Sequence, residues 1–199
     1  PTQPVAAGPC QQGPGPLEPC IVRIGGTNSW DTPVPGLQDL QPGLAGISFG
    51  NSLIKQVAAD LAQELPGIGT FVTLSPLPGF ARWLSETGVD TNHVDGQALC
   101  ALGAYFLAQA KDRSGMPFDA VARFHLGNGA ILHQVHADAD RSEKGLGQSA
   151  GLMVNYLYDL DQIAQNHERF ATTGQVPTSP HVRALCAQAQ KFLHSEKTA

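Results

Sequence analysis

Ser75 and His125 are the two side chains whose types and settings best suit acid–base chemistry. Ser75 ends an apolar, β-branched segment and directly precedes Pro76. His125 stands between Phe124 and Leu126, and an imidazole changes its charge close to neutral pH. A serine before a proline is also a common turn residue, and a histidine among apolar residues is commonly a packed core residue. The local sequence therefore leaves a catalytic and a structural role open for both.

A second serine, Ser149, lies at the centre of a G-x-S-x-G pattern over residues 147–151. In serine hydrolases this pattern places the nucleophile on a sharp turn between a strand and a helix. Here polar residues precede Ser149 and the β-like segment GLMVNYLY (151–158) follows, so the order of elements is reversed. Asp159 and His167 follow in the chain order of a triad, but such residues are common. The pattern is therefore a poor indication of a hydrolase.

The metal-ligating residue types form no convincing cluster. His133, His136 and Asp138 lie on or beside an expected strand, where residues three apart point to opposite faces. The four cysteines are widely separated, with no C-x-x-C pair and no zinc-like spacing: Cys10, Cys20, Cys100 and Cys186. We expect no metal site and free thiols, with a Cys10–Cys20 disulfide as the alternative.

The composition limits the class of protein. The chain has 199 residues, of which 42% are hydrophobic, with a net charge of -5 and a pI of about 5.7. This length predicts one domain with a real core, and the acidic balance offers no basic surface for nucleic acid. No apolar stretch reaches the roughly 18 residues of a membrane span, and no signal peptide is visible. We expect a cytoplasmic protein without nucleic-acid or membrane partners.

Hydrophobic periodicity predicts the elements that position these residues. Apolar residues recur at helical spacing in segments 50–65, 97–110 and 181–194. Shorter or more polar segments also read as helical: 81–86, 120–126 and 159–172. β-branched and aromatic residues mark strands at 69–75, 130–137 and 151–158, and the last two could pair antiparallel. The segment 141–149 reads as a polar, glycine-containing connection.

This order of elements predicts a mixed α/β (α+β) domain over residues 43–199. Residues 1–42 are crowded with proline and glycine, and only IVRI (21–24) resembles a strand. Because proline and glycine at this density disfavour regular helix and sheet, we expect an irregular flank there.

Four segments resemble the malonyl-CoA decarboxylase family. They are GLAGISFGNSLIKQV (43–57), GTFVTLSPLPGFARWL (69–84), VARFHLGNGAIL (121–132) and KGLGQSAGLMVNYLYDLD (144–161). The resemblance covers residues 43–195 and corresponds to the C-terminal part of the family's catalytic domain. It implies part of a mixed sheet flanked by helices, similar to the GCN5-related acetyltransferases. The implied reaction is the decarboxylation of malonyl-CoA to acetyl-CoA and CO2 in fatty-acid metabolism.

The resemblance also implies roles for particular residues. Ser75 matches the family's proton acceptor, His125 its proton donor, and Tyr158 an active-site tyrosine. The segment before the first helix matches the family's malonyl-CoA-binding loop: Ala45, Gly46, Ile47, Ser48, Phe49, Gly50 and Asn51. Backbone N–H groups at such a loop and helix start suit the pyrophosphate of CoA.

No cofactor is expected beyond the CoA of the substrate, because the thioester carbonyl itself accepts the electrons released with CO2. The family resemblance also implies a homo-oligomer.

Two alternatives for the function remain open at this stage. One is a CoA-dependent acyltransferase, since the fold class is shared. The other is an inactive, truncated relative, because residues 1–42 do not resemble the family's strands before the CoA loop.

Overall fold

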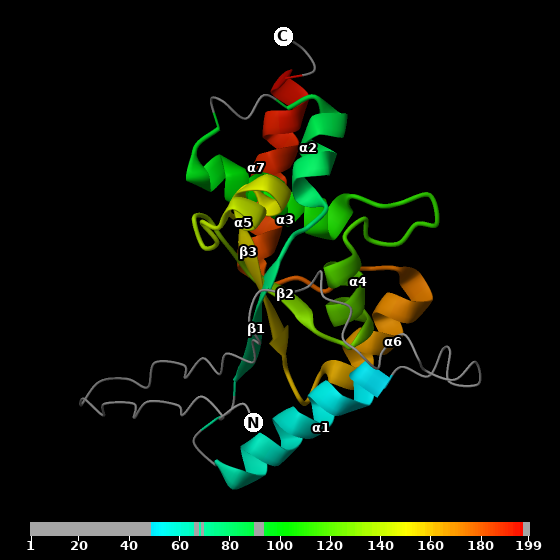
Figure 1. Cartoon of the computed structure of the whole chain (residues 1–199). Helices are drawn as coiled ribbons and strands as arrows, with labels where there is room; N and C mark the ends of the chain where they lie inside the picture. The colour runs from blue at the N-terminus through cyan, green and yellow to red at the C-terminus, as the bar shows by residue number, and fades with distance from the viewer. Residues whose placement is uncertain (1–48, 66–67, 69, 90–93, 197–199) are drawn as a thin grey trace, which may run out of the picture.

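A computed structural model describes residues 49–65, 68, 70–89 and 94–196, and its centre is a three-stranded sheet (Figure 1). The strands are β1 (Phe71–Pro76), β2 (Ile131–His136) and β3 (Met153–Tyr158), in the order β1-β3-β2. Both pairings are antiparallel. The expected antiparallel pairing of the two late strands is therefore confirmed, and so is the mixed α/β class.

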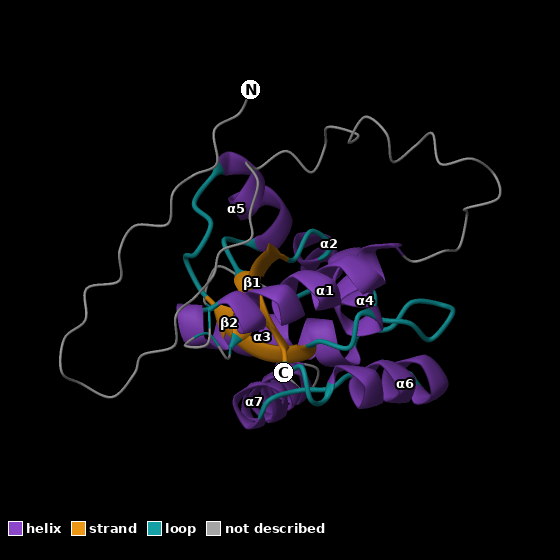
Figure 2. Cartoon of the chain, turned by 90° about the horizontal axis from the view of Figure 1, so that it is seen from below, coloured by secondary structure: helices purple, strands orange, loops and turns teal. Residues whose placement is uncertain are grey.

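Seven helices are described around this sheet. They are α1 (Phe49–Glu64), α2 (Phe80–Thr87), α3 (Gly96–Gln109), α4 (Ala120–Gly127), α5 (Glu143–Ser149), α6 (Ile163–Thr173) and α7 (Pro180–Glu196). Figure 2 shows α4, α6 and α7 along one side of the sheet in the view from below. No helix among these residues is long and apolar enough to cross a membrane. The expected flank 1–42, with its IVRI strand, lies outside the described residues.

The register of the sheet places four polar or aromatic side chains on one face. Thr73 lies opposite Tyr156, and Ser75 lies opposite Val154, in the β1–β3 ladder. Because side chains two residues apart share a face, Thr73, Ser75, Tyr156 and Tyr158 all point to the same side. Tyr156 and Tyr158 are buried there. We call this the tyrosine face of the sheet.

A large part of the apolar core lies where α3 meets α7 and β2. α3 is apolar on most sides, and Leu102, Phe106 and Leu107 are completely buried. A Cβ added at Gly103 would lie 2.6 Å from a methyl carbon of the buried Leu152, so any larger residue here would force Leu152 to move. Each large apolar side chain buried here contributes roughly 1.5–3 kcal/mol of transfer free energy. This core fixes the sheet from which the polar residues project.

Residues 143–149 form helix α5, so the expected polar connection was wrong. The Ser142 hydroxyl accepts a hydrogen bond from the Gly145 N–H at 3.0 Å and caps the first turn. Glu143 adds negative charge at the positive end of the helix dipole. A Cβ at Gly145 would lie 2.3 Å from the carboxyl carbon of Asp140. This glycine therefore reflects close packing rather than a loop.

The helix expected over 159–172 begins later, at Ile163. Asp159 instead forms the turn before the helix: its carboxylate accepts from the Asp161 N–H at 3.1 Å, and its carbonyl from the Ile163 N–H at 2.9 Å. An aspartate that bonds the backbone two residues ahead competes with helix formation.

Candidate active site

Ser75 and His125 are 50 residues apart in sequence and lie in contact in the structure. The Ser75 Oγ is 3.1 Å from the His125 Nε2. Ser75 comes from the end of β1, and His125 from the last turn of α4, which packs over the tyrosine face. Both side chains are buried, with 5% and 7% of their surface exposed. The structure thus brings the two predicted catalytic residues together.

Tyr158 joins the same group through the other ring nitrogen. Its hydroxyl lies 2.7 Å from the His125 Nδ1. The Ser75 hydroxyl donates to the Thr73 Oγ1 at 3.2 Å. With that hydrogen engaged, Ser75 Oγ accepts from Nε2–H, and Nδ1 accepts from the Tyr158 hydroxyl. The result is one directed chain of hydrogen bonds from Tyr158 through His125 and Ser75 to Thr73.

Burial sets the protonation of this group. It lowers the pKa of His125 to about 4, so the ring is neutral at pH 7 and carries a single N–H. Burial also raises the pKa of the Tyr158 phenol, so the hydroxyl is protonated in the resting site. A neutral imidazole between two hydroxyls can receive a proton on one nitrogen while it gives one from the other.

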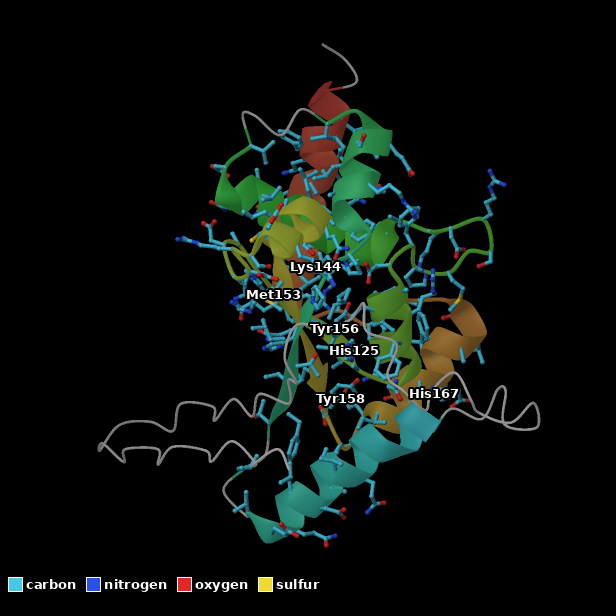
Figure 3. The ribbon with its side chains drawn as sticks, viewed as in Figure 1. His125, Lys144, Met153, Tyr156, Tyr158 and His167 are labelled. Carbon is cyan, nitrogen blue, oxygen red and sulfur yellow. The ribbon has the colours of Figure 1, made fainter. Side chains whose placement is uncertain are left out.

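Tyr156 is a site residue that the sequence analysis missed. Its ring stacks on the His125 ring, with centroids 4.3 Å apart and an interplanar angle of 20° (Figure 3). The signal was present in the sequence, because Tyr156 and Tyr158 are two residues apart on a strand and must share a face. The stacking restricts rotation of the imidazole, so it helps to hold both ring nitrogens on their hydroxyl partners.

Helix α4 is only eight residues long, and both of its ends are held by side chains. The Asp119 carboxylate accepts from the Ala122 N–H at 2.9 Å and caps its first turn. At its other end, the Asn128 amide donates to the Phe124 carbonyl at 2.7 Å. His167 on α6 donates from Nδ1 to the Gly127 carbonyl at 2.6 Å (Figure 3). A helix too short to be stable by itself is thereby fixed where it presents His125.

The expected CoA loop is only partly within the described residues. Ala45 to Ser48 lie outside them, and Phe49, Gly50 and Asn51 form the first residues of α1. The expected helix at 50–65 is confirmed, whereas the binding role of 45–51 stays a prediction. Two open hollows among the described residues both lie along α7, and neither is lined by Ser75, His125 or Tyr158.

The other sequence patterns have different surroundings. Ser149 ends α5 and precedes β3, which is the reverse of a nucleophile elbow. His136 is hydrogen-bonded to the Asn155 side chain. The described residues contain no group of three or more His, Cys, Asp or Glu side chains placed to hold a metal ion. Cys100 and Cys186 are free thiols, whereas Cys10 and Cys20 lie outside the described part of the chain.

The family model for the malonyl-CoA decarboxylase C-terminal domain matches this chain over two overlapping segments, residues 35–98 and 89–196. The chain belongs to this family. Malonyl-CoA decarboxylase from Rattus norvegicus, named as mitochondrial, is 31% identical over 195 residues. The aligned region covers 75% of this chain and 39% of the rat protein.

Solved decarboxylase structures share the fold. The malonyl-CoA decarboxylase of Rhodopseudomonas palustris is 44% identical with a TM-score of 0.63, covering 73% of this chain and 40% of that structure. The Agrobacterium vitis structure gives the same identity and TM-score, covering 73% of this chain and 42% of its own. The chain thus spans about two-fifths of the length of the decarboxylases that it matches.

Proposed function

We propose that this chain carries the acid–base residues of a malonyl-CoA decarboxylase, which converts malonyl-CoA to acetyl-CoA and CO2. The observation that supports this most directly is the buried chain of hydrogen bonds from Tyr158 through His125 to Ser75. Its members match the residues that the family resemblance assigns, although they come from three separate elements.

The reaction needs a binding position for the malonyl carboxylate, a hydrogen-bond donor to the enolate oxygen and a proton source for the enolate carbon. Loss of CO2 leaves the electron pair of the broken C–C bond in a thioester enolate. In our proposal the bound substrate replaces two hydrogen bonds of the resting site. The Ser75 hydroxyl turns from Thr73 to the departing carboxylate and orients it, so that the breaking bond lines up with the carbonyl π system. The His125 Nε2–H turns from Ser75 to the enolate as charge develops, which stabilises the transition state.

The same ring then supplies the proton to carbon. As Nε2 gives its proton to the enolate carbon, Nδ1 takes the proton of the Tyr158 hydroxyl, so the imidazole stays neutral throughout. Water returns one proton to Tyr158, which balances the single proton that the overall reaction consumes. A neutral ring suits this relay, because a permanently charged imidazolium would form a stable ion pair with the substrate carboxylate and oppose its departure.

The remaining expectations belong to the same proposal. The loop Ala45–Asn51 would hold the CoA pyrophosphate on backbone N–H groups at the start of α1. The substrate supplies the only CoA, and the reaction needs no metal. A cytoplasmic location and a homo-oligomer complete the proposal.

The test is the release of CO2 and acetyl-CoA from malonyl-CoA by the purified protein. Ser75→Ala and His125→Asn should each lower kcat by roughly 10²–10⁴, while the circular dichroism spectrum stays that of the folded protein. Either variant turning over at the wild-type rate would exclude the proposed roles. Acyl transfer to an added amine without CO2 release would instead identify an acyltransferase.

A further inference from the structure

The G-x-S-x-G serine has a clear partner in the structure. The Ser149 hydroxyl accepts a hydrogen bond from the Leu77 backbone N–H at 3.1 Å, and only 1% of the residue is exposed. Leu77 is two residues beyond Ser75, in the short turn Pro76–Gly79 that ends β1 and leads into α2. A serine from α5, distant in sequence, thus holds the backbone next to the proposed catalytic serine.

Asp119 holds the other end of that turn. One carboxylate oxygen accepts from the Gly79 N–H at 3.2 Å, and the other accepts from the Ala122 N–H at 2.9 Å, which caps α4. Asp119 is 1% exposed, and burial raises the pKa of its carboxyl. Burying a carboxylate is costly, and two backbone N–H groups at helix starts offset that cost.

Asp119 therefore connects the two halves of the site. Through Gly79 it bonds the turn that follows Ser75, and through Ala122 it bonds the helix that ends at His125. A Cβ at Gly79 would approach the Asp119 carboxylate to 3.5 Å and the Phe106 ring to 3.2 Å, so the backbone lies close to both. The carboxylate also acts on Tyr156: after burial, it is the next cause of that residue's raised pKa.

We propose that Asp119 and Ser149 are positioning residues that clamp the Pro76–Gly79 turn, and so hold Ser75 at hydrogen-bond distance from His125. Neither residue bonds Ser75 or His125 directly. The proposal deepens the proposed decarboxylase function and rests on it for its kinetic part. It also assigns the G-x-S-x-G serine a role as a hydrogen-bond acceptor rather than a nucleophile.

A double-mutant cycle separates positioning from a general effect on folding. Asp119→Asn keeps the side-chain volume, but its amide has one acceptor oxygen where the carboxylate has two. Ser149→Ala removes the hydroxyl that accepts from the Leu77 N–H. Each should lower kcat about tenfold or more, with KM changed little, because an ångström of misplacement can cost about a hundredfold. In a Ser75→Ala background Ser149→Ala should lower kcat no further, because Ser149 bonds only the turn that follows Ser75.

The matched control is Asp95→Asn. Asp95 caps α3 in the same way, accepting from the Ala98 N–H at 2.8 Å, but it is exposed and bonds no part of the Pro76–Gly79 turn. Its replacement should leave kcat within about twofold of wild type, as for ordinary surface changes. Equal losses from Ser149→Ala in the Ser75 and Ser75→Ala backgrounds would overturn the clamp, and so would wild-type kcat in both clamp variants.

A second measurement does not depend on activity. NMR titration of the His125 ring reports its burial against Ser75, Tyr156 and Tyr158, which face it from β1 and β3. If the clamp holds the turn, Asp119→Asn and Ser149→Ala should raise the pKa of His125 from about 4, and Asp95→Asn should not. An unchanged pKa in both clamp variants would overturn the proposal. If both clamp variants shift the pKa of His125 but the wild-type protein shows no decarboxylase activity, the clamp stands and only the proposed function is refuted.

Discussion

Two histidines lie on opposite faces of the same sheet, and each is hydrogen-bonded to a β3 side chain. His125, on the tyrosine face, bonds Tyr158 and Ser75, whereas His136 bonds Asn155 on the other face. The Asn155 amide in turn donates to the Thr73 carbonyl at 2.8 Å. One network ends on hydroxyls, which can release protons; the other ends on an amide and a carbonyl, which cannot.

The comparison shows that a histidine in a hydrogen-bonded network is not by itself a sign of catalysis. His125 is almost fully buried under a stacked tyrosine ring, whereas His136 is half-buried. Burial and proton-carrying partners together make the first network suitable for chemistry. The second network connects all three strands across the sheet, and its role is structural.

The largest expected effect is that of replacing His125, and the replacement of His136 is its matched comparison. His125→Asn should lower kcat for malonyl-CoA by roughly 10²–10⁴, because it removes the proposed proton donor. His136→Asn should leave kcat within about threefold, since its network carries no proton. Steady-state kinetics of the two variants, with melting curves for both, would check this. Equal losses in the two would remove the distinction between the faces.

The pH dependence of stability should follow the buried histidine. The folded-state pKa of His125 is about 4, below the unfolded value of about 6.5, so between these values the unfolded chain binds more protons. The stability that His125 contributes is therefore present above pH 6.5 and lost as the pH falls towards 4, by up to roughly 3 kcal/mol. Urea unfolding at several pH values should show this loss, and His125→Asn should reduce it. An identical pH profile in the variant would contradict the assignment.

The two tyrosines on the tyrosine face offer a smaller, matched comparison. Tyr158→Phe removes the hydroxyl bonded to His125 and should lower kcat about 10- to 100-fold, the equivalent of roughly 1–3 kcal/mol. The buried Tyr156 hydroxyl has no hydrogen-bond partner among the described residues, so Tyr156→Phe keeps the stacked ring and should leave stability equal or higher. Parallel kinetics and thermal unfolding distinguish them. A greater loss of activity in Tyr156→Phe would reverse the roles assigned here.

The smallest effect is expected on the second face. Asn155→Ala removes the bonds to His136 and to the Thr73 carbonyl and should lower the free energy of unfolding by about 1–2 kcal/mol. Turnover should stay near the wild-type rate, because Ser75 and His125 keep their contact. Denaturant midpoints measured beside kcat would show whether stability and activity separate as expected. A large kcat loss without unfolding would mean that the second network also serves the site.

Most elements could be predicted from the sequence, because their hydrophobic period is strong. The strands at 71–76 and 153–158 and the helices at 49–64 and 96–109 are all close to their predicted bounds. Helix α5 could not be predicted, since its glycines suggested a loop, and the close approach of the Asp140 carboxylate to Gly145 is seen only in the folded backbone. Periodicity reports burial on one face, but it does not report which side chain approaches a glycine.

The site residues also fall into two groups: those that the sequence could indicate and those that only the fold reveals. Ser75, His125 and Tyr158 could be named from a family resemblance, and Tyr156 could have been found from its spacing to Tyr158. Asp119 carries no such signal, because its importance lies in a bond to Gly79, 40 residues earlier. Ser149 was singled out by a motif whose meaning does not apply here. Only the fold shows that its hydroxyl faces the Leu77 backbone.

The bonds that build this site join distant parts of the chain. Ser75 and His125 are 50 residues apart, and Leu77 and Ser149 are 72 apart. In the second network, on the other face, Thr73 and Asn155 are 82 apart. Closing such loops costs entropy before any contact stabilises them, and non-local contacts slow folding. During refolding, helical circular dichroism should therefore return before enzyme activity, because no short segment holds a working part of the site.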